Sequence, residues 1–174
     1  MTNDLPEPSA QTALERPTAD IEDAYRAGGR LRSCEIQFRQ YGRRKRFSGV
    51  VRTVSVFEDN ALVKAVLREP GGENVLVVDG GGSLRAALMG DTIAALAQTN
   101  GWAGVIIFGA VRDVEALATI DIGIKALGSN PWKSGKAGAG FVDIDVFLGN
   151  ARFAPGSYVY SDDDGILIAD ARLA

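Results

Sequence analysis

The sequence predicts a single α/β domain with a β-rich C-terminal part. In the middle of the chain, residues 74–78 form a short apolar run, residues 91–100 have one apolar helical face, and residues 104–109 form a second apolar run. Continuous apolar runs are typical of strands buried on both faces, and their order implies a crossover between parallel strands. From Gly138 onward, short alternating strands and turns take over. A length of 174 residues with 46% hydrophobic residues suits one buried core.

The first element is expected after a flexible tail over residues 1–16, which is polar and punctuated by prolines. Thr18 and Asp20 offer capping side chains for a short helix that runs from Ile21 to Tyr25. Two consecutive glycines follow and are expected to end it. The domain is therefore expected to span residues 17–174.

The remaining elements follow from local patterns of valine, glycine and proline. Gly49 is expected to form a bulge or turn within the first long strand. A Pro-Gly-Gly sequence at Pro70 stops the helix that precedes it. In chain order, we predict a strand over 47–57, a helix over 60–67, the three central elements, a helix over 114–119, and strands over 122–127, 141–148, 152–153, 158–160 and 166–169.

Composition excludes several kinds of chemistry. The chain has no histidine, which removes Ser-His-Asp and Cys-His catalysis and histidine general bases. Its single cysteine, Cys34, leaves no internal disulfide and suits a reducing compartment. Net charge is −3, which argues against a protein built to coat nucleic acid. No apolar run approaches the roughly 20 residues of a spanning helix, and the N-terminus lacks a signal-peptide pattern, so we expect a soluble cytoplasmic protein without a membrane partner.

Two phosphate-binding motifs are incomplete in this sequence. Gly80-Gly-Gly-Ser-Leu-Arg85 follows a predicted buried strand, but Arg85 stands where a dinucleotide fingerprint needs its third glycine. Ser134-Gly-Lys136 resembles the end of a P-loop, yet Asn130 replaces the first glycine and Ala137 the final Ser or Thr. Neither motif predicts a nucleotide site.

A stronger combination joins the start of one helix to the end of a strand. Gly90-Asp91-Thr92-Ile93 opens the predicted helix, where free backbone N–H groups and the positive end of the dipole suit a small anion. Arg112 and Asp113 follow the buried strand, where ligands gather in α/β sheets. The planar guanidinium of Arg112 suits a carboxylate or keto oxygen, and Asp113 suits Mg²⁺ or Mn²⁺. The alternatives from the residues alone are a capping role for Asp91 and a surface ion pair between Arg112 and Asp113.

With these motifs in place, the sequence resembles the RraA-like family, which contains the regulators of ribonuclease E activity and the 4-hydroxy-4-methyl-2-oxoglutarate aldolases. The resemblance runs from about Pro17 to Asp170, and Leu88-Met-Gly-Asp91 with Gly109-Ala-Val-Arg-Asp113 is its most specific part. The other matching motifs are Pro17-Thr-Ala-Asp20, Tyr41-Gly-Arg-Arg-Lys-Arg-Phe47-Ser-Gly49, Phe57-Glu-Asp-Asn60, Val78-Asp-Gly80, Asp121-Ile-Gly123, Pro155-Gly156 and Tyr160-Ser-Asp-Asp-Asp-Gly165.

The resemblance implies a swivelling β/β/α fold, ring-shaped homotrimers and a class II aldolase that depends on a divalent metal. Such an enzyme splits 4-hydroxy-4-methyl-2-oxoglutarate into two pyruvates and decarboxylates oxaloacetate as a side activity. On the matching positions, the amides of Gly90, Asp91, Thr92 and Ile93 would hold the substrate carboxylate. Arg112 would bind the substrate, and Asp113 would anchor Mg²⁺ or Mn²⁺; Arg112 and Asp113 are thus the catalytic candidates.

The sequence departs from the family pattern at two places. Longer aldolases of the family carry extra C-terminal sequence with a further acidic residue, whereas this chain stops at Ala174. Ser157 stands where the family often has Asp after Pro-Gly, which we interpret as a turn effect. Asp113, which some regulator members lack, is kept, and this favours catalysis.

Other functions remain open from the sequence. The basic cluster of Arg43, Arg44, Lys45 and Arg46 suggests a non-catalytic regulator that binds a ribonuclease E-type endonuclease, with a solvated loop or a subunit contact as its alternative. Lys125 would be the nucleophile of a Schiff-base aldolase, although a half-exposed structural lysine is the simpler interpretation. A methyltransferase function is not favoured, because the sequence has no glycine-rich cofactor loop followed by a ribose-binding acid. We expect Trp102 and Trp132 to be core or interface anchors, and Asp162-Asp-Asp164 to form a turn rather than a metal site.

Overall fold

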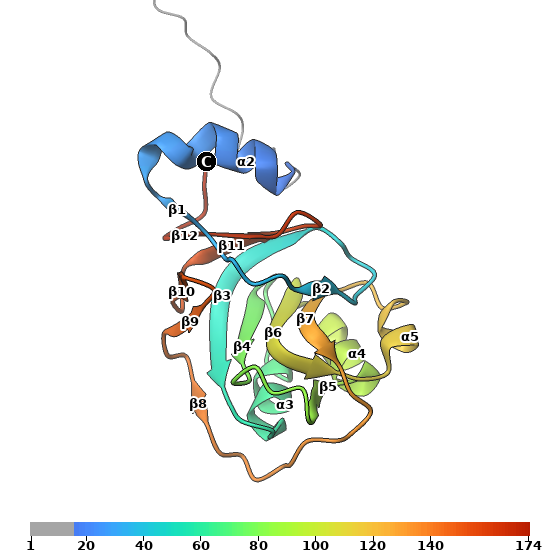
Figure 1. Cartoon of the computed structure of the whole chain (residues 1–174). Coiled ribbons are helices and arrows are strands. Elements are labelled where there is room, and N and C mark those ends of the chain that lie inside the picture. Colours follow the sequence, from blue (N-terminus) through green and yellow to red (C-terminus); the bar gives the residue numbers. More distant parts are fainter. Residues whose placement is uncertain (1–15) are drawn as a thin grey trace, which may run out of the picture.

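The computed structural model describes residues 16–174, which form one mixed α/β domain (Figure 1). Within this part of the chain, ten strands join one sheet, and the predicted α/β class is confirmed. The predicted tail over 1–16 lies outside the described residues except for Arg16. No helix of residues 16–174 is long and apolar enough to cross a membrane.

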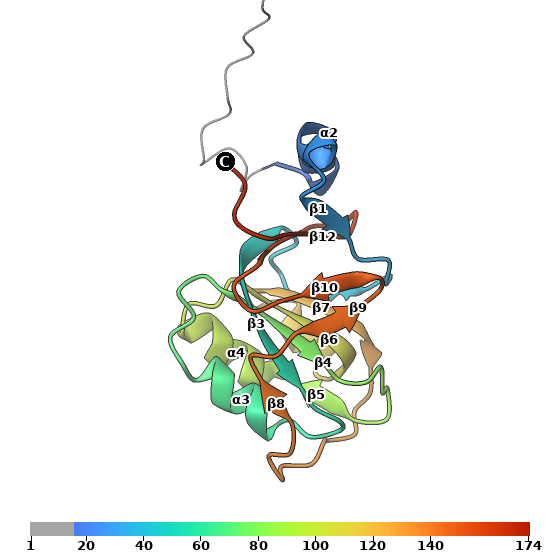
Figure 2. The same ribbon diagram turned by 90° about the vertical axis from the view of Figure 1, so that its left-hand side faces the viewer.

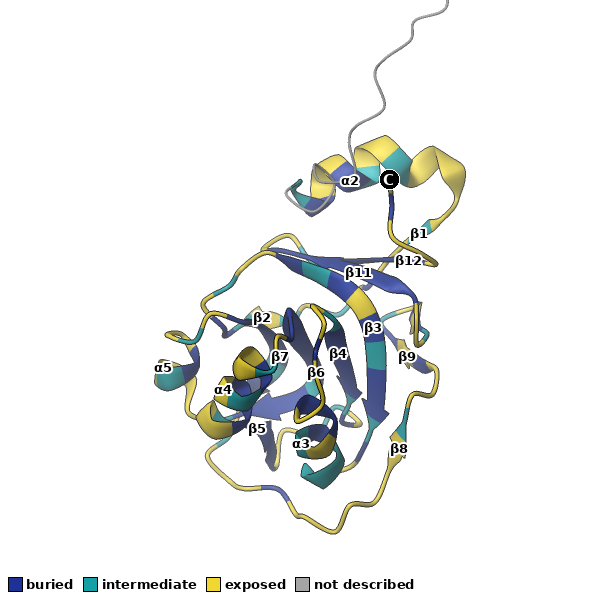
Figure 3. Ribbon diagram, turned by 180° about the vertical axis from the view of Figure 1, so that it is seen from behind, coloured by how far each residue is buried: buried dark blue, intermediate teal, exposed yellow. Residues whose placement is uncertain are grey.

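The centre of the sheet is parallel, as the strand–helix–strand succession predicts. Valines and isoleucines fill these strands, and the crossover helices pack on one face, as Figure 3 shows for α3 and α4. A short strand that the sequence did not predict, β5 (Ala87–Met89), pairs in parallel with β6. The parallel core comprises β3 (Phe47–Ser55), α3 (Ala61–Leu67), β4 (Val75–Asp79), α4 (Asp91–Thr99), β6 (Gly104–Val111), α5 (Val114–Leu117) and β7 (Gly123–Ser129).

Antiparallel strands lie at both edges of the sheet, and two further strands form a small sheet of their own. The predicted strand over 141–148 is divided in two, because Asp143 adopts a left-handed φ of 55° and its N–H donates to the carbonyl of Thr53. The two-residue and three-residue strands near the N-terminus were also not predicted, since they are too short for a periodic pattern. Beyond β3 the sheet continues with β11 (Tyr158–Ser161), β12 (Ile166–Ala169) and β1 (Leu31–Ser33), and β8 (Phe141–Val142) also pairs with β3. At the opposite edge, β2 (Arg39–Gln40) pairs with β7, while β9 (Val146–Leu148) and β10 (Ala151–Phe153) form the separate two-stranded sheet.

Both faces of the parallel strands are buried, which explains their continuous apolar runs. On β4, Leu76 and Val78 join the cluster beneath the helices. Val75 and Val77 point to the opposite face, where they pack with residues of the C-terminal strands such as Phe153. Alternate side chains of a strand point to opposite faces, so both sets must be apolar here.

The first helix differs from its prediction. Helix α2 (Thr18–Tyr25) begins at Thr18, and a turn of 3₁₀ helix, η1 (Arg26–Gly28), continues it until Gly29, which has a φ of 63°. Thr18 does not cap the helix: its N–H and its hydroxyl donate to the carboxylate of Asp162, at 2.6 and 2.7 Å. Figures 1 and 2 both show α2 near the C-terminus, away from α3 and α4.

Gly49 corrects a second local prediction. It lies inside β3 in regular register with β11, opposite Val159, and forms neither bulge nor turn. A Cβ at this position would lie 2.3 Å from the carbonyl oxygen of Glu73. Glycine is therefore required because the segment before β4 passes against the strand.

Candidate active site

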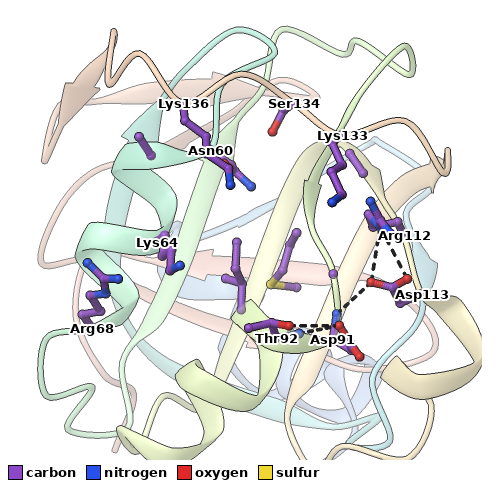
Figure 4. Close-up of a pocket in the computed structure, with 15 residues that line it drawn as sticks. Asn60, Lys64, Arg68, Asp91, Thr92, Arg112, Asp113, Lys133, Ser134 and Lys136 are labelled. Carbon is purple, nitrogen blue, oxygen red and sulfur yellow. Dashed lines mark hydrogen bonds and ion pairs between the residues drawn. The ribbon is translucent and has the colours of Figure 1, made fainter.

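A cavity of about 440 Å³ opens beside the carboxyl ends of β5 and β6 (Figure 4). It brings together the residues expected to bind the substrate and the metal: Gly90, Asp91, Thr92, Ile93, Arg112 and Asp113. Further lining residues come from α3 and from the loop after β7, namely Asn60, Ala61, Lys64, Arg68, Lys133, Ser134 and Lys136, with Ala87 and Met89 of β5 at its base.

The pairing of β5 with β6 places the two predicted motifs side by side. Met89 lies opposite Val111, and the N–H of Arg112 donates to the carbonyl of Met89 at 2.9 Å. Because the strands are parallel, the residues that follow each of them emerge at the same edge of the sheet. Gly90 then caps α4 in an extended conformation, and the helix begins at Asp91.

Asp113 sits at the amino end of α4. Its carboxylate accepts a hydrogen bond from the N–H of Asp91 at 3.3 Å and one from Nε of Arg112 at 3.4 Å. Negative charge is favoured at this end of a helix, where N–H groups lack intrahelical partners. Asp113 itself has a left-handed backbone, with a φ of 56°, which is uncommon for a residue other than glycine. Strained conformations of this kind recur at functional sites.

The first amides of α4 are engaged by carboxylates of this chain. The N–H of Thr92 donates to Oδ1 of Asp91 at 2.7 Å, while the N–H of Asp91 donates to Asp113. Asp91 is the first helical residue rather than the cap, which is Gly90. The protein thus holds carboxylate oxygens at the helix end where the sequence analysis expects a substrate carboxylate.

The charge of the cavity favours an anionic ligand. Its two carboxylates, on Asp91 and Asp113, are outnumbered by cationic side chains from three segments of the chain. Among the described residues that line it, these cations are Lys64, Arg68, Arg112, Lys133 and Lys136. Such an excess of positive charge attracts small anions.

The sequence analysis missed the loop that carries Ser134 and Lys136. Asp59, only 6% exposed, fastens this loop by accepting hydrogen bonds from the N–H groups of Ala61 at 3.0 Å, of Ala137, and of Gly138 at 3.2 Å. Burial alone would raise the pKa of Asp59, but these backbone N–H groups hold that pKa below its ordinary value. The rejected P-loop fragment is thus a pocket-lining loop, and a strand rather than a helix follows it.

The oxygen donors of the cavity fit Mg²⁺ or Mn²⁺. Residues 16–174 contain no group of three or more Asp, Glu, Cys or His side chains placed to hold a metal. Mg²⁺ commonly binds through one or two carboxylates and keeps waters or substrate oxygens as its other ligands. Asp113, with Asp91 beside it, meets that requirement, whereas a structural zinc site needs more protein ligands.

Comparison with known proteins identifies the family of this chain. The family model described as RraA-like, Aldolase/RraA, matches residues 18–168. The chain belongs to the RraA-like family.

Solved RraA-like structures carry different functional names. A protein of Geobacillus kaustophilus HTA426, described as an S-adenosylmethionine:2-dimethylmenaquinone methyltransferase, is 45% identical, with a TM-score of 0.86 over 91% of this chain and 97% of its own. The RNA-processing inhibitor RraA from Thermus thermophilis is also 45% identical, with a TM-score of 0.87 over 91% of this chain and 95% of its own. Streptomyces coelicolor RraAS2, described as an unusual member of the RNase ES inhibitor RraA protein family, shares the fold at 24% identity, with a TM-score of 0.76 over 95% of this chain and 86% of its own.

The glycine loop after β4 folds back on the RraA-like core. The N–H groups of Gly80 and Gly82 both donate to the carbonyl of Phe108, at 3.1 Å, and the N–H of Gly81 donates to Asp79. These donors are already used, so they are not available to cradle a phosphate. The structure therefore agrees with the rejection of a dinucleotide site.

Lys125 lies outside the cavity of Arg112 and Asp113. It is 3% exposed, so the half-exposed position expected from the sequence is wrong. It lines a separate cavity with Cys34, Asp163 and Asp164. Burial lowers the pKa of Lys125, and the nearby carboxylates of Asp163 and Asp162 oppose that shift.

The basic cluster makes ion pairs within the chain. The guanidinium of Arg44 pairs with Asp121 at 3.2 Å, and Lys45 lies 3.9 Å from Asp163. Asp162-Asp-Asp164 forms the predicted turn: the N–H of Asp162 donates to the carbonyl of Gly165, and that of Asp164 to Asp162. Both observations favour structural roles for these charges.

The two tryptophans differ in position. Trp102 is buried in the core beneath the helices, and its indole N–H donates to the carbonyl of Glu69 at 3.0 Å. Trp132 is 72% exposed and therefore does not belong to the core of this chain.

Proposed function

We propose that this RraA-like protein is a divalent-metal-dependent aldolase that cleaves 4-hydroxy-4-methyl-2-oxoglutarate to two pyruvates, with oxaloacetate decarboxylation as a secondary activity. The observation that carries the proposal is the meeting of Arg112, Asp113 and the amino end of α4 in one cation-rich cavity. The family description, which names aldolases, supports the same reaction class.

Each of these groups has a chemical part in the proposal. Arg112 binds the 2-oxo acid through its planar guanidinium. The first N–H groups of α4 orient the carboxylate of the substrate, which replaces the carboxylates of Asp113 and Asp91 as their hydrogen-bond acceptor. Asp113, with Asp91, would hold Mg²⁺ or Mn²⁺. The bound cation supplies electrostatic stabilisation of the negative charge that develops when the C–C bond breaks. Arg112 strengthens that stabilisation, because its charge cannot be lost by deprotonation.

The test is release of pyruvate from both substrates with Mg²⁺ or Mn²⁺, measured beside EDTA and an Asp113→Ala variant. Metal-dependent release that exceeds the rate of the metal alone, and that is lost in Asp113→Ala, supports the proposal. Release equal to that of the metal alone, with either metal and either substrate, would overturn it.

We also propose that the protein is a homotrimer with subunit contacts beside the cavity. Three large apolar side chains are exposed: Trp132, which directly precedes the lining residue Lys133, by 72%, Phe57 by 59% and Leu84 by 48%. Exposed apolar side chains of this size are typical of interaction surfaces. Light scattering coupled to size-exclusion chromatography gives the mass directly, and a Trp132→Glu variant that becomes monomeric would identify the contact.

A second candidate function is regulation of a ribonuclease E-type endonuclease, without catalysis. The name of the 45% identical Thermus protein, an RNA-processing inhibitor, favours it. Binding to such an endonuclease, compared with a variant in which Arg43, Arg44, Lys45 and Arg46 are neutral, tests the role of the basic cluster. A sharp loss of binding would support a role of the basic cluster in binding the endonuclease, and unchanged binding would reject that role.

The methyltransferase name of the Geobacillus protein does not lead our proposal. The glycine loop after β4 uses its N–H groups within the chain, as described above. We further propose that the protein works in a reducing compartment such as the cytoplasm, because Cys34 is a buried free thiol.

A further inference from the structure

The wall of the cavity opposite Arg112 carries positive charge that the proposed roles do not use. Lys64 on α3 and Arg68, which caps the carboxyl end of that helix, are one helical turn apart, and both line the cavity on the side opposite Arg112 (Figure 4). Within residues 16–174, neither side chain pairs with a carboxylate inside 4 Å. Two uncompensated cations therefore border the same cavity from its far side.

Ser134 provides an independent sign of a missing ligand. Its hydroxyl oxygen is buried and has no hydrogen-bond partner among the described residues, and the residue is only 9% exposed. Figure 4 shows this oxygen directed toward the interior of the cavity. A buried hydroxyl that lacks a partner is unfavourable, so such groups normally meet a water or a ligand.

Hydrogen bonds hold the backbone on the C-terminal side of Ser134 in place. The N–H of Gly135 donates to the carbonyl of Glu58 at 2.8 Å, and the carbonyl of Gly135 accepts from the N–H of Asn60 at 3.1 Å. Asp59 fastens the following residues, Ala137 and Gly138. The backbone at Ser134 is thus ordered before a ligand binds, which reduces the entropic cost of binding.

We infer that Ser134 and Lys64 form a second anion subsite, which binds the distal carboxylate of a 2-oxo dicarboxylic acid while Arg112 and α4 bind its 2-oxo acid end. The inference rests on the proposed function for the identity of the substrate end. A hydroxyl donor and an ammonium suit a carboxylate, which accepts up to about four hydrogen bonds. A cavity of about 440 Å³ has room for a dicarboxylic acid of five or six carbons.

Binding of matched ligands tests the subsite without any need for turnover. 2-Oxoglutarate and 2-oxopentanoate have the same 2-oxo acid end and the same chain length, and only the first carries a distal carboxylate. Calorimetry on the wild-type protein with Mg²⁺ should show at least ~10-fold tighter binding of 2-oxoglutarate, the factor that one charge-assisted hydrogen bond provides. The Ser134→Ala and Lys64→Gln variants should each lose most of this preference, whereas Lys45→Gln, a lysine outside the cavity, should keep it.

Kinetics give a second readout if the proposed aldolase is active. For Ser134→Ala and Lys64→Gln, kcat/KM should fall about 10- to 100-fold with 4-hydroxy-4-methyl-2-oxoglutarate. It should change less than about threefold with 4-hydroxy-2-oxopentanoate, which lacks the distal carboxylate. Equal losses with both substrates would overturn the subsite and indicate a general effect on the cavity.

Failure of the two proposals can be told apart. Absence of turnover with a clear preference of the wild-type protein for 2-oxoglutarate would reject the aldolase and retain the subsite. Turnover without any such preference would retain the aldolase and reject the subsite.

Discussion

Gly90 and Asp113 are so close that no larger residue fits at position 90. An ideal Cβ built on Gly90 would lie 2.4 Å from Oδ2 of Asp113 and 3.0 Å from Cγ of Arg112. The backbone of Gly90, with a φ of −131°, is one that alanine adopts without strain. The glycine is therefore required by the catalytic candidates beside it and not by its own conformation.

A Gly90→Ala variant should consequently fold and lose activity. The added methyl group displaces the Asp113 carboxylate or the Arg112 side chain, and displacements of about 1 Å at a site of this kind reduce rates by about 100-fold. We expect kcat/KM for pyruvate release to fall by at least ~10-fold while Tm changes by less than about 5 °C. Gly28→Ala is the matched control, since a Cβ there meets only Cγ of Arg30 at 4.0 Å. Full activity in Gly90→Ala would show that the close approach of position 90 to the Asp113 carboxylate is not needed for activity.

Asp113→Asn should lose metal binding and activity while the protein still folds. The amide keeps the size of the side chain but removes the negative charge that a divalent cation needs, so pyruvate release should fall about 100-fold or more. Titration with Mn²⁺ should show weaker metal binding in the variant. The control is Glu115→Gln, which removes a carboxylate from an exposed position two residues further along, outside the cavity. An equal effect of both substitutions would argue against Asp113 as the metal anchor.

Asp59→Asn should loosen the loop that carries Ser134 and Lys136. In the wild-type protein, backbone N–H groups of the loop donate to both oxygens of the Asp59 carboxylate. In the variant, the NH₂ group of asparagine replaces one of these oxygens and cannot accept a hydrogen bond, so part of the loop attachment is lost. Limited digestion with trypsin should then cut after Lys133 or Lys136 several-fold faster than in the wild-type protein, because cleavage follows local opening. Asp145→Asn, which removes only an ion pair with Arg152, should leave the rate of cleavage unchanged. If the Asp59→Asn protein resists trypsin as well as the wild type does, Asp59 does not hold the loop.

Asp162→Asn should show a stability defect that shrinks at low pH. Burial raises the pKa of Asp162, but hydrogen bonds from the N–H and hydroxyl of Thr18 and from the N–H of Asp164 outweigh it and leave the pKa lowered. The ionised form thus stabilises the fold above the unfolded-state pKa of about 3.9, and this contribution is lost as pH falls through the lowered folded-state pKa. At pH 7 the variant should be less stable by roughly 2 kcal/mol, and the difference should shrink as pH falls below the unfolded-state pKa of about 3.9.

Urea unfolding at pH 7 and at pH 3 measures both values for Asp162→Asn. A penalty that stays constant with pH would mean that the charge of Asp162 is not what secures helix α2.

Lys125→Met should be at least as stable as the wild-type protein at pH 7. Burial lowers the folded-state pKa of Lys125 below the unfolded-state value of about 10.4, so below the folded-state pKa the fold must bury a charge. Between the two pKa values the unfolded chain binds more protons, and the stability of the wild-type protein therefore rises with pH. The difference between the two proteins in urea unfolding should narrow from pH 7 to pH 10. A strongly destabilised variant at pH 7 would reveal that pairing with Asp162 and Asp163 outweighs the burial.

Much of the fold follows from local sequence. The apolar runs before Asp79 and Phe108, with the helical face between them, were sufficient to predict the parallel core, because residue periodicity is set by neighbours along the chain. The candidate site could be predicted for a related reason. Gly90 opens a helix and Arg112 follows a buried strand, and ligands bind at such positions in α/β proteins. The family resemblance then supplied the roles that spacing alone left open.

Other features had no local signal. Strand β5 has three residues, too few for a period, although its pairing with β6 is what aligns Gly90 with Arg112. Asp59 and Ser134 are far apart in sequence and share one loop attachment only after folding. Thr18 has the pattern of a cap but hydrogen-bonds Asp162, which is 144 residues away.

By itself, the sequence determined the α/β class, the absence of histidine chemistry and the pair of motifs around Gly90 and Asp113, because composition and short-range periodicity are properties of the chain. Only the tertiary structure decided that the loop with Ser134 lines the same cavity, that Lys125 is buried away from it, and that Lys64 and Arg68 line the cavity together with Arg112. These facts depend on which distant segments pack together, and packing is governed by the whole core rather than by neighbours in sequence.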